Sequence, residues 1–399
     1  MSPCHFSVPA RDHAWRQLAL PAKRGIMSKA QSCYGVAGPW RNSYPMRPSH
    51  ILQILEREFL STTGGGHTPV MLWGPPGVGK SQIIMQIARA HRVPLIDIRL
   101  SQMEPTDLRG IPFRAGARVE WSVPSLLPDA GRQGARGILF LDEITSAPPT
   151  VTAAAYQLIL DRRLGEYRVP EGWAIFAAGN RYGDRGVAYV MPSPLANRFT
   201  HYEIEPNLDD WVAWAHANNI DPRVIAFLRF RPDLLFDFNP AQNPVAFPSP
   251  RSWEYAHRAL AKFGGEPALL LDALQACVGA AGGVEFKAFI ENMDQLPDID
   301  AIVRGESAGV PPGIDLQYGV AAALVRRALQ ARELSHATLV YGYILKYAKL
   351  FPEREMGVML VTDLHRSIGK PLFGVPEFAE WASSITDLML YDLKLSSPP

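Results

Sequence analysis

The sequence is poor in cysteine, with Cys4, Cys33 and Cys277 as its only three. They are too few and too scattered for a disulfide framework or a zinc site, and they fit a reducing compartment, so we expect a cytoplasmic protein. Long hydrophobic runs are also missing, since no stretch of about 18 apolar residues occurs that could form a transmembrane helix. Neither charge prevails, because 40 Lys and Arg stand against 39 Asp and Glu. The overall charge therefore gives no sign of a nucleic-acid partner. A balanced overall charge does not, however, exclude a local basic channel.

The first 48 residues differ in composition from the rest of the chain. Asp12 is their only acidic residue, and no hydrophobic periodicity is sustained there. Their basic residues are Arg11, Arg16, Lys23, Arg24, Lys29, Arg41 and Arg47. The apolar core of a secretory signal is missing, whereas a basic, acid-poor composition also suits a transit peptide. We expect residues 1–48 to be a disordered or non-native extension, with a transit peptide as the alternative.

Strand and helix patterns alternate over the next part of the chain. Apolar residues at helical spacing predict a helix over residues 51–60. Buried strands are predicted at 70–73, 94–100, 137–141 and 173–178, and helices at 81–90 and 150–160. This alternation is typical of an α/β fold with a parallel sheet and helices on both faces, whose ligands bind at the carboxyl ends of the strands. We predict an α/β core over residues 49–240, then a proline-rich stretch and a helical part over residues 241–399.

The segment between the predicted strand 70–73 and the predicted helix 81–90 fits G-x-x-x-x-G-K-[ST], the pattern of a phosphate-binding loop. Its residues are Gly74, Pro75, Pro76, Gly77, Val78, Gly79, Lys80 and Ser81. Glycines let successive backbone N–H groups curl around a phosphate, and the helix that follows adds the positive end of its dipole. Lys80 would bring its charge to the β- and γ-phosphates, and the Ser81 hydroxyl would be a ligand of Mg²⁺. The loop predicts binding of a nucleoside triphosphate with Mg²⁺.

Two acids follow the apolar strand 137–141. In enzymes with such a loop the first acid, here Asp142, holds Mg²⁺, usually through its water. The second, here Glu143, can polarise the attacking water as a general base. A solvated turn gives the same pattern, but the acids end the next strand but one after the loop, which favours the catalytic interpretation. Binding together with a candidate base predicts hydrolysis.

Three further polar residues are candidates for the same site. Asn180 follows the strand 173–178 and can orient the lytic water, or it can cap a turn. Arg198, next to Phe199, can act on the nucleotide of a neighbouring subunit, or it can lie on the surface. An arginine supplied in this way contributes about 10³–10⁵ in rate. Arg251 lies near the start of a predicted helix, directly after Pro250, where a plain surface arginine is the alternative.

In this order the motifs resemble those of an AAA+ ATPase, in particular the MoxR group with its CbbQ/NorQ-like relatives, over about residues 50–260. The resemblance implies an AAA+ core, an all-α lid and a helical C-terminal extension. It makes residues 74–81 Walker A, Asp142 and Glu143 Walker B, Asn180 sensor 1, Arg198 the arginine finger and Arg251 sensor 2.

The stretch between Walker A and Walker B carries the more specific part of the resemblance. Residues 104–113 are similar to the Asp-Leu-x-Gly segment of MoxR-type proteins. Residues 111–115 and 118–121, around Gly116, predict the hairpin inserted in this clade, with a surface loop as the alternative. Two features depart from the family pattern. The aromatic-hydrophobic-Gly pore loop of threading unfoldases is missing, and helices predicted at 320–334, 336–349 and 378–390 run past the usual small lid.

The resemblance also implies how the protein works. The active unit would be a ring, a hexamer, because Arg198 can reach only a neighbour's nucleotide, and hydrolysis would move the lid through Arg251. Such a ring would remodel or activate a client protein, for example a metalloenzyme, with a separate partner that bears a von Willebrand factor A domain. The alternatives are a chelatase-like motor subunit and a nucleic-acid-linked motor or defence component. The last of these would use the arginines of the insert and of a possible second hairpin, Arg109, Arg114, Arg118, Arg162 and Arg163.

Overall fold

The computed structural model describes residues 45–62, 66–181, 183–184, 189–242, 244–306 and 309–384. Most of the predicted N-terminal extension, residues 1–44, lies outside these ranges, as does the last part of the helix predicted at 378–390. Residues 45–48 belong to the fold, because strand β1 (Pro45–Met46) pairs with a strand of the main sheet and helix α1 starts at Pro48.

A six-stranded parallel sheet forms the centre of the first part of the chain, in the order β1-β10-β2-β9-β6-β3. Its other strands are β2 (Val70–Trp73), β3 (Leu95–Arg99), β6 (Arg136–Asp142), β9 (Gly172–Gly179) and β10 (Thr200–Ile204). The predicted strands therefore all form. The strand that ends in Asp142 is separated from β2 by β9, so three strand ends lie next to one another.

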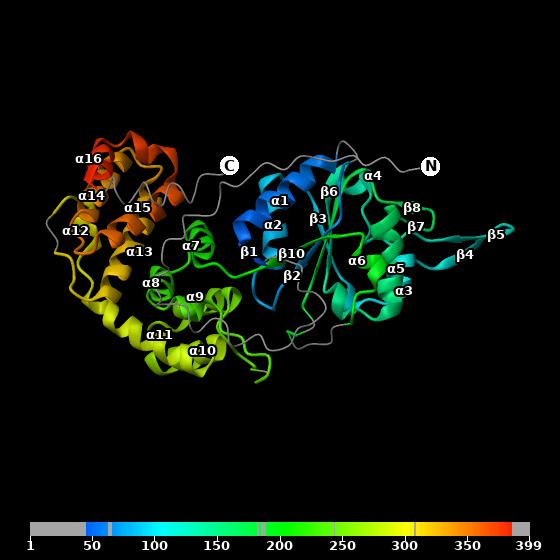
Figure 1. Cartoon of the computed structure of the whole chain (residues 1–399), viewed down its shortest axis with the longest axis horizontal. Helices are drawn as coiled ribbons and strands as arrows, with labels where there is room; N and C mark the ends of the chain where they lie inside the picture. The colour runs from blue at the N-terminus through cyan, green and yellow to red at the C-terminus, as the bar shows by residue number, and fades with distance from the viewer. Residues whose placement is uncertain are drawn as a thin grey trace, which may run out of the picture. The chain divides into compact units, whose positions relative to one another are not determined.

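Helices cover both faces of this sheet (Figure 1). Helices α1 (Pro48–Ser61) and α2 (Lys80–Ala90) lie on one face, and α3 (Pro105–Arg109), α5 (Pro149–Asp161) and α6 (Ser193–Ala196) lie on the other. Because side chains alternate along a strand, β2 buries Leu72 in the cluster with α1 and α2 and Met71 in the cluster with α5. A short helix α4 (Ala130–Gln133) precedes β6.

The predicted insert is a two-stranded antiparallel hairpin, which confirms the prediction. Its strands are β4 (Pro112–Ala115) and β5 (Arg118–Trp121), and Gly116 lies in the turn with a φ of 64°. Gly110 precedes it with a φ of 82°, and a Cβ there would lie 1.7 Å from the carbonyl oxygen of Ser122, so only glycine fits. A second hairpin, β7 (Arg163–Leu164) and β8 (Tyr167–Arg168), follows α5.

Helices make up the rest of the described chain. They are α7 (Leu208–Ala217), α8 (Pro222–Phe230), α9 (Pro250–Phe263), α10 (Pro267–Val278), α11 (Ala280–Asn292), α12 (Ile299–Val303), α13 (Ile314–Ala331), α14 (Ala337–Ala348), α15 (Arg354–Ile368) and α16 (Pro376–Ser384). Short 3₁₀ turns are η2 (Leu100–Gln102), η3 (Ile144–Ser146), η4 (Pro232–Leu235), η5 (Met293–Gln295) and η6 (Lys370–Gly374). The predicted fold class, a parallel α/β core followed by helices, is confirmed. No helix in the described ranges is both long and apolar enough to cross a bilayer.

Helices α7 and α8 precede the proline-rich stretch but pack with the helices that follow it. The ring of Phe227 on α8 lies 5.3 Å from that of Trp253 on α9 and 5.0 Å from that of Phe286 on α11. Arg229 of α8 also donates hydrogen bonds to Asp363 of α15, at 2.6 and 2.7 Å, and both side chains are largely buried. The domain limits at residues 240 and 241 stay a prediction, but these contacts place α8 in the helical layer.

Candidate functional site

Three strand ends build one edge of the sheet. Trp73 of β2 stands in register with Gly179 of β9, and Leu141 of β6 stands in register with Ala177. Since all three strands run in parallel, the residues that follow them emerge at the same edge. Residues 74–81 follow β2, Asn180 follows β9, and Asp142 ends β6. The sheet therefore brings the predicted loop, amide and acid together.

The loop after β2 has the backbone that a phosphate site needs. Gly77 and Gly79 adopt φ values of 84° and 98°, in the left-handed region that side chains disfavour. Gly79 is also the residue before α2, and a Cβ there would meet no heavy atom within 4 Å. The first N–H groups of α2 have no partner within the helix and carry its positive dipole end, so an anion would be bound there. The loop thus fits the phosphates of a nucleotide.

The ammonium of Lys80 lies in the centre of this edge. It donates hydrogen bonds to the carbonyl oxygens of Gly74 and Pro75, at 2.6 and 3.0 Å, and to Oδ1 of Asn180 at 2.9 Å. Burial lowers the pKa of Lys80 to about 8, although the nearby Asp142 carboxylate acts in the opposite direction. The lysine is therefore positioned by neutral oxygens and held where its charge is poorly solvated.

Ser81 and Asp142 lie next to each other, as the metal prediction requires. The Ser81 hydroxyl donates to Oδ2 of Asp142 at 2.8 Å, while Oδ1 accepts the backbone N–H of Glu143 at 2.9 Å. In the described part of the chain no group of three or more His, Cys, Asp or Glu could hold a metal ion on its own. Mg²⁺ usually takes only one or two carboxylates and completes its shell with water and phosphate oxygens. The hydroxyl and the carboxylate fit that donor set.

Glu143 has an unusual backbone and a partner that the sequence did not reveal. Its φ is 56°, which is rare for a residue with a side chain and often marks a functional position. The hydroxyl of Ser101, in η2 directly after β3, donates to Oε2 of Glu143. This hydrogen bond engages one oxygen of the predicted base. Ser101 is the polar residue after a fourth strand of the same sheet, and that pattern could have singled it out.

Asn180 is tied to the strand end of the two acids through Thr145. Its backbone N–H donates to Oγ1 of Thr145 at 3.2 Å, and that hydroxyl donates to the carbonyl oxygen of Asn180 at 3.3 Å. The carbonyl oxygen of Thr145 accepts the N–H of Tyr189 at 2.7 Å. Sequence reasoning missed Thr145, because a threonine after Asp-Glu carries no distinct pattern.

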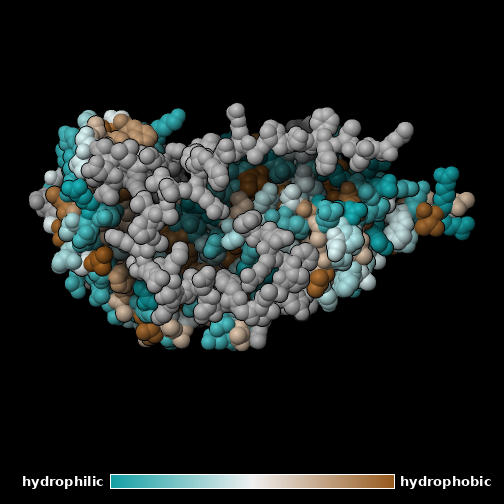
Figure 2. Space-filling model, in the orientation of Figure 1, coloured by the Kyte–Doolittle hydropathy of each residue, from teal (hydrophilic) through white to brown (hydrophobic). Residues whose placement is uncertain are grey.

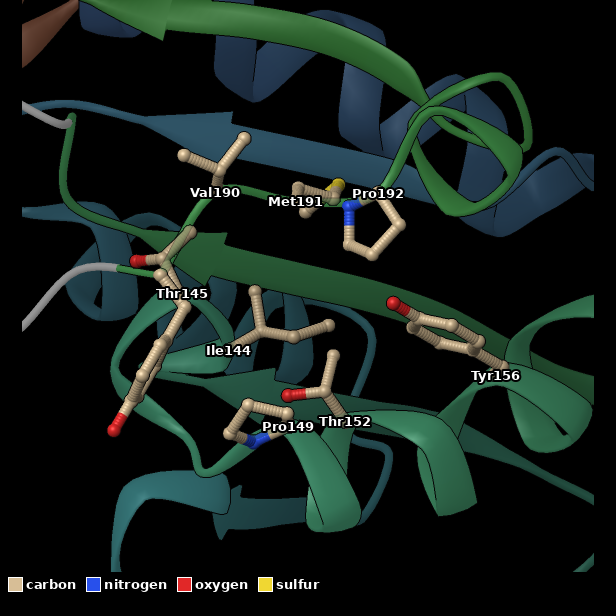
Figure 3. A pocket seen from close by; sticks show the side chains of 9 residues that line it. Ile144, Thr145, Pro149, Thr152, Tyr156, Val190, Met191 and Pro192 are labelled. Atoms are coloured by element: carbon tan, nitrogen blue, oxygen red, sulfur yellow. The ribbon is translucent and has the colours of Figure 1, made fainter.

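A small apolar pocket lies beside this network (Figure 3). It is lined by Ile144, Thr145, Pro149, Thr152, Tyr156, Tyr189, Val190, Met191 and Pro192. Its walls come from η3 and α5 on one side and from the segment before α6 on the other. The turn after Asp142 and Glu143 and the segment that leads to Arg198 therefore meet across apolar surface as well as at Thr145.

Of the two predicted arginines, Arg251 lies beside this cluster, where its charge helps to lower the pKa of Lys80, and Arg198 lies on the surface. The backbone N–H of Arg251 donates to the carbonyl oxygen of Gly77 at 3.2 Å, so the start of α9 touches the loop through its main chain. A Cβ on Gly77 would lie 2.8 Å from Oγ of Ser249, which caps α9 and was also missed. Arg198 is exposed, and its Nη1 donates to the carbonyl oxygen of Pro194 at 2.6 Å. Within the described ranges no hydrogen bond or ion pair joins either guanidinium to the other site residues.

Comparison with known proteins finds a family similar to part of the core. Residues 69–199 match the family model described as AAA domain (dynein-related subfamily). Its limits include the phosphate-binding loop, Asp142, Glu143, Asn180 and Arg198, whereas Arg251 lies beyond them. The match supports an AAA+ ATPase.

Curated relatives resemble this part of the chain. Denitrification regulatory protein NirQ of Pseudomonas aeruginosa is 35% identical over 115 residues, which cover 29% of this chain and 41% of NirQ. Midasin of Giardia intestinalis is 30% identical over 158 residues, which cover 38% of this chain and 3% of midasin. The chain thus spans less than half the length of either relative.

Solved structures resemble the chain weakly. The RuvB Holliday junction branch migration motor of Thermotoga maritima is 15% identical, with 75% of this chain and 87% of that chain covered, and gives a TM-score of 0.32. A putative ATPase from Cytophaga hutchinsonii is 12% identical, with 78% of this chain and 80% of that chain covered, and gives 0.30. With TM-scores this low, the two structures say nothing about what residues 69–199 do.

The affinity for a nucleoside triphosphate is expected to fall as the pH rises above about 8. Burial holds the pKa of Lys80 at about 8, so the ammonium loses its proton above that pH, while a bound polyphosphate would favour the charged form. Binding then takes up a proton, and the Kd should rise by up to about tenfold per pH unit. Titration with a fluorescent ATP analogue between about pH 7 and pH 9.5 checks this.

Lys80→Arg is the control, because its charge persists over this range, and its affinity should not change with pH. An equally flat profile for the unchanged protein would contradict the proton uptake.

Proposed function

We propose that this chain is an AAA+ ATPase that hydrolyses ATP at the edge formed by β2, β9 and β6. The observation that carries the proposal is the convergence of Lys80, Ser81, Asp142 and Asn180, joined by side-chain hydrogen bonds of 2.8 and 2.9 Å. An isolated Gly-rich turn would need none of these partners. The AAA domain found over residues 69–199 supports the same reaction.

Each residue has a distinct part in the proposed hydrolysis. The loop N–H groups and Lys80 bind the phosphates, and Ser81 with Asp142 would hold Mg²⁺, which when bound neutralises charge on the β- and γ-phosphates. Glu143 accepts the proton of the attacking water, and Asn180 orients that water. Arg251, at the start of α9, would contact the γ-phosphate only before cleavage. The hydrogen bond from its N–H to Gly77 supports a lid that responds to the loop.

Glu143→Gln is expected to keep ATP binding and to lower turnover by about 10²–10⁴-fold, because it removes the base and leaves the phosphate cradle. Lys80→Ala is expected to abolish binding, because the cradle loses its charge. Phosphate release and ATP-analogue binding, measured side by side on the purified variants, check both effects. Unchanged turnover in Glu143→Gln would assign the base to another group.

We further propose that the active unit is a ring, a hexamer in the MoxR manner, in which Arg198 acts on the neighbour's ATP. Two observations support this. Arg198 is exposed, and within the described part of the chain no hydrogen bond or ion pair joins its side chain to Lys80, Asp142 or Asn180 of its own site. It also directly precedes the buried Phe199, which fixes its place at the end of α6.

Mixing two inactive variants tests the role of Arg198 in trans. Arg198→Ala keeps the pocket and loses the finger, whereas Lys80→Ala keeps the finger and loses the pocket. Arg198→Ala alone is expected to lose about 10³–10⁵ in turnover, and Lys80→Ala alone is expected to be inactive because it binds no ATP. An equimolar mixture is expected to recover part of the turnover, because some pockets then face an intact Arg198. Mixed assembly is verified by native mass spectrometry. Mixed rings without recovered turnover would assign Arg198 to the surface.

The proposed client is a protein. The resemblance to the MoxR group and the likeness to a denitrification regulatory protein support remodelling or activation of an enzyme, with maturation of a metalloenzyme as one form. A separate partner with a von Willebrand factor A domain would complete such a system. The hairpin β4–β5 offers apolar surface for a client, since Val119 is 67% and Trp121 is 51% exposed. Figure 2 shows hydrophobic next to hydrophilic side chains at that hairpin.

A nucleic-acid motor is the second candidate, because Arg114 and Arg118 are exposed on the same hairpin. Arginine and aromatic side chains together bind single strands. Arg162, which this function would also need, is engaged elsewhere. Its Nη2 donates to the carbonyl oxygens of Pro170 and Trp173 at 2.9 and 2.6 Å. A chelatase-like motor, which inserts metal into a small molecule, uses the same ATP chemistry and remains the third candidate.

Affinity capture from native lysate distinguishes the clients. Glu143→Gln with ATP and Mg²⁺ is the bait, and Lys80→Ala is its control. With nuclease added we expect an ATP-dependent protein partner, which is lost with Val119→Ser plus Trp121→Ser and kept with Arg114→Gln plus Arg118→Gln. Co-purification of nucleic acid alone, without nuclease and sensitive to the arginine changes, would instead assign the nucleic-acid function.

A further inference from the structure

His201 on β10 joins two segments that the proposed function uses separately. Its Nδ1 lies 2.9 Å from Nε1 of Trp73, the last residue of β2 before the phosphate-binding loop. Its Nε2 lies 2.7 Å from the carbonyl oxygen of Ala196, the last residue of α6. The imidazole also stacks on the Trp73 indole, at 6.0 Å between ring centroids, and meets the edge of Phe199 at 6.2 Å.

The hydrogen-bond partners of the two ring nitrogens of His201 determine which nitrogen carries the proton. The indole N–H of Trp73 can only donate, so Nδ1 accepts and carries no proton. The carbonyl oxygen of Ala196 can only accept, so Nε2 carries the proton and donates. The two contacts therefore require the same neutral tautomer and support each other. A side chain that merely filled this space would not need either nitrogen.

One end of this bridge is fixed in the nucleotide site. Trp73 is followed by Gly74, whose carbonyl oxygen accepts a hydrogen bond from the Lys80 ammonium at 2.6 Å. Met71 on the same strand pairs in register with His201, so β2 and β10 already hold the imidazole beside the base of the loop. The His201 ring is thus braced against the strand that positions the phosphates.

The other end is fixed beside Arg198. Ala196 is two residues before Arg198, and its carbonyl oxygen also accepts the N–H of Phe199 at 3.2 Å. Leu195 and Phe199 are buried on either side of this turn, whereas Arg198 itself is exposed. Apolar burial fixes the depth of the turn but does not specify its rotation, because such contacts have no preferred direction. The hydrogen bond from His201 supplies that direction.

We propose that His201 is a positioning residue for Arg198: it holds the turn after α6 in the orientation from which the arginine reaches a neighbouring subunit's nucleotide. The inference rests on the proposed action of Arg198 in trans. It goes beyond that proposal because it names what orients the arginine. This is His201, which connects the turn after α6 with Trp73 on β2 of the same subunit.

Mixed rings distinguish this positioning role from a general structural role. In them the Lys80→Ala subunit is the finger donor, because it supplies Arg198, and the Arg198→Ala subunit is the pocket donor, because it supplies the nucleotide pocket. His201→Phe keeps a flat ring and removes both hydrogen bonds. Placed in the Lys80→Ala subunit, which donates the finger, it should lower turnover of the mixed rings by about tenfold, as expected for lost hydrogen bonds. Placed in the Arg198→Ala subunit, which donates only the pocket, it should change turnover by less than about twofold. His201→Gln keeps an amide donor for the Ala196 carbonyl and should recover most of the loss in the finger donor.

The controls separate the possible failures. Native mass spectrometry verifies that every mixture forms rings, and ATP-analogue binding by the pocket donor verifies its fold. If the parent mixture with unchanged His201 recovers no turnover, Arg198 has no role in trans and the inference falls with it. If the parent mixture is active but His201→Phe has the same effect in both subunits, His201 acts on its own loop or on stability, and the inference alone is overturned. An effect confined to the pocket donor would overturn it as well.

Discussion

The parallel pairing of β2, β9 and β6 is the constraint on which the site depends. Parallel strands in register end at one level, so the residues after Trp73, Gly179 and Leu141 emerge together even though they are far apart in the sequence. These strands are buried on both faces, by α1 and α2 on one side and α5 on the other. A slip of one residue in any of them would exchange its two faces, and hydrophobic packing resists that.

Polar contacts then convert this common edge into one connected unit. Lys80 holds the side chain of Asn180, Thr145 holds its main chain, and the Thr145 carbonyl continues to the segment before α6. These contacts, together with those of His201, connect the loop after β2 with the segment that carries Arg198.

Much of the fold and the centre of the site could be predicted from the sequence, because their signals are local. Buried strands appear as apolar runs, and residues 74–81, Asp142, Glu143 and Asn180 lie directly after such runs. Ser101 also follows a strand, but Thr145 and His201 could not be found in this way, since their roles depend on partners that only the folded sheet brings near. The same reason explains α8. Its local sequence does not specify that Phe227 packs against Trp253 of α9.

The contact between residues 77 and 249 limits how related chains can diverge. Gly77 has a φ of 84° and no room for a Cβ beside Ser249, so position 77 cannot adjust to a change at position 249. A bulkier residue at 249 has to be absorbed by a shift of α9 away from the loop. A substitution of Ser249, the cap of α9, would thus change the angle between α9 and the loop that contains Gly77. Two related chains could then differ in the angle between α9 and the loop while both keep Lys80, Asp142 and Glu143.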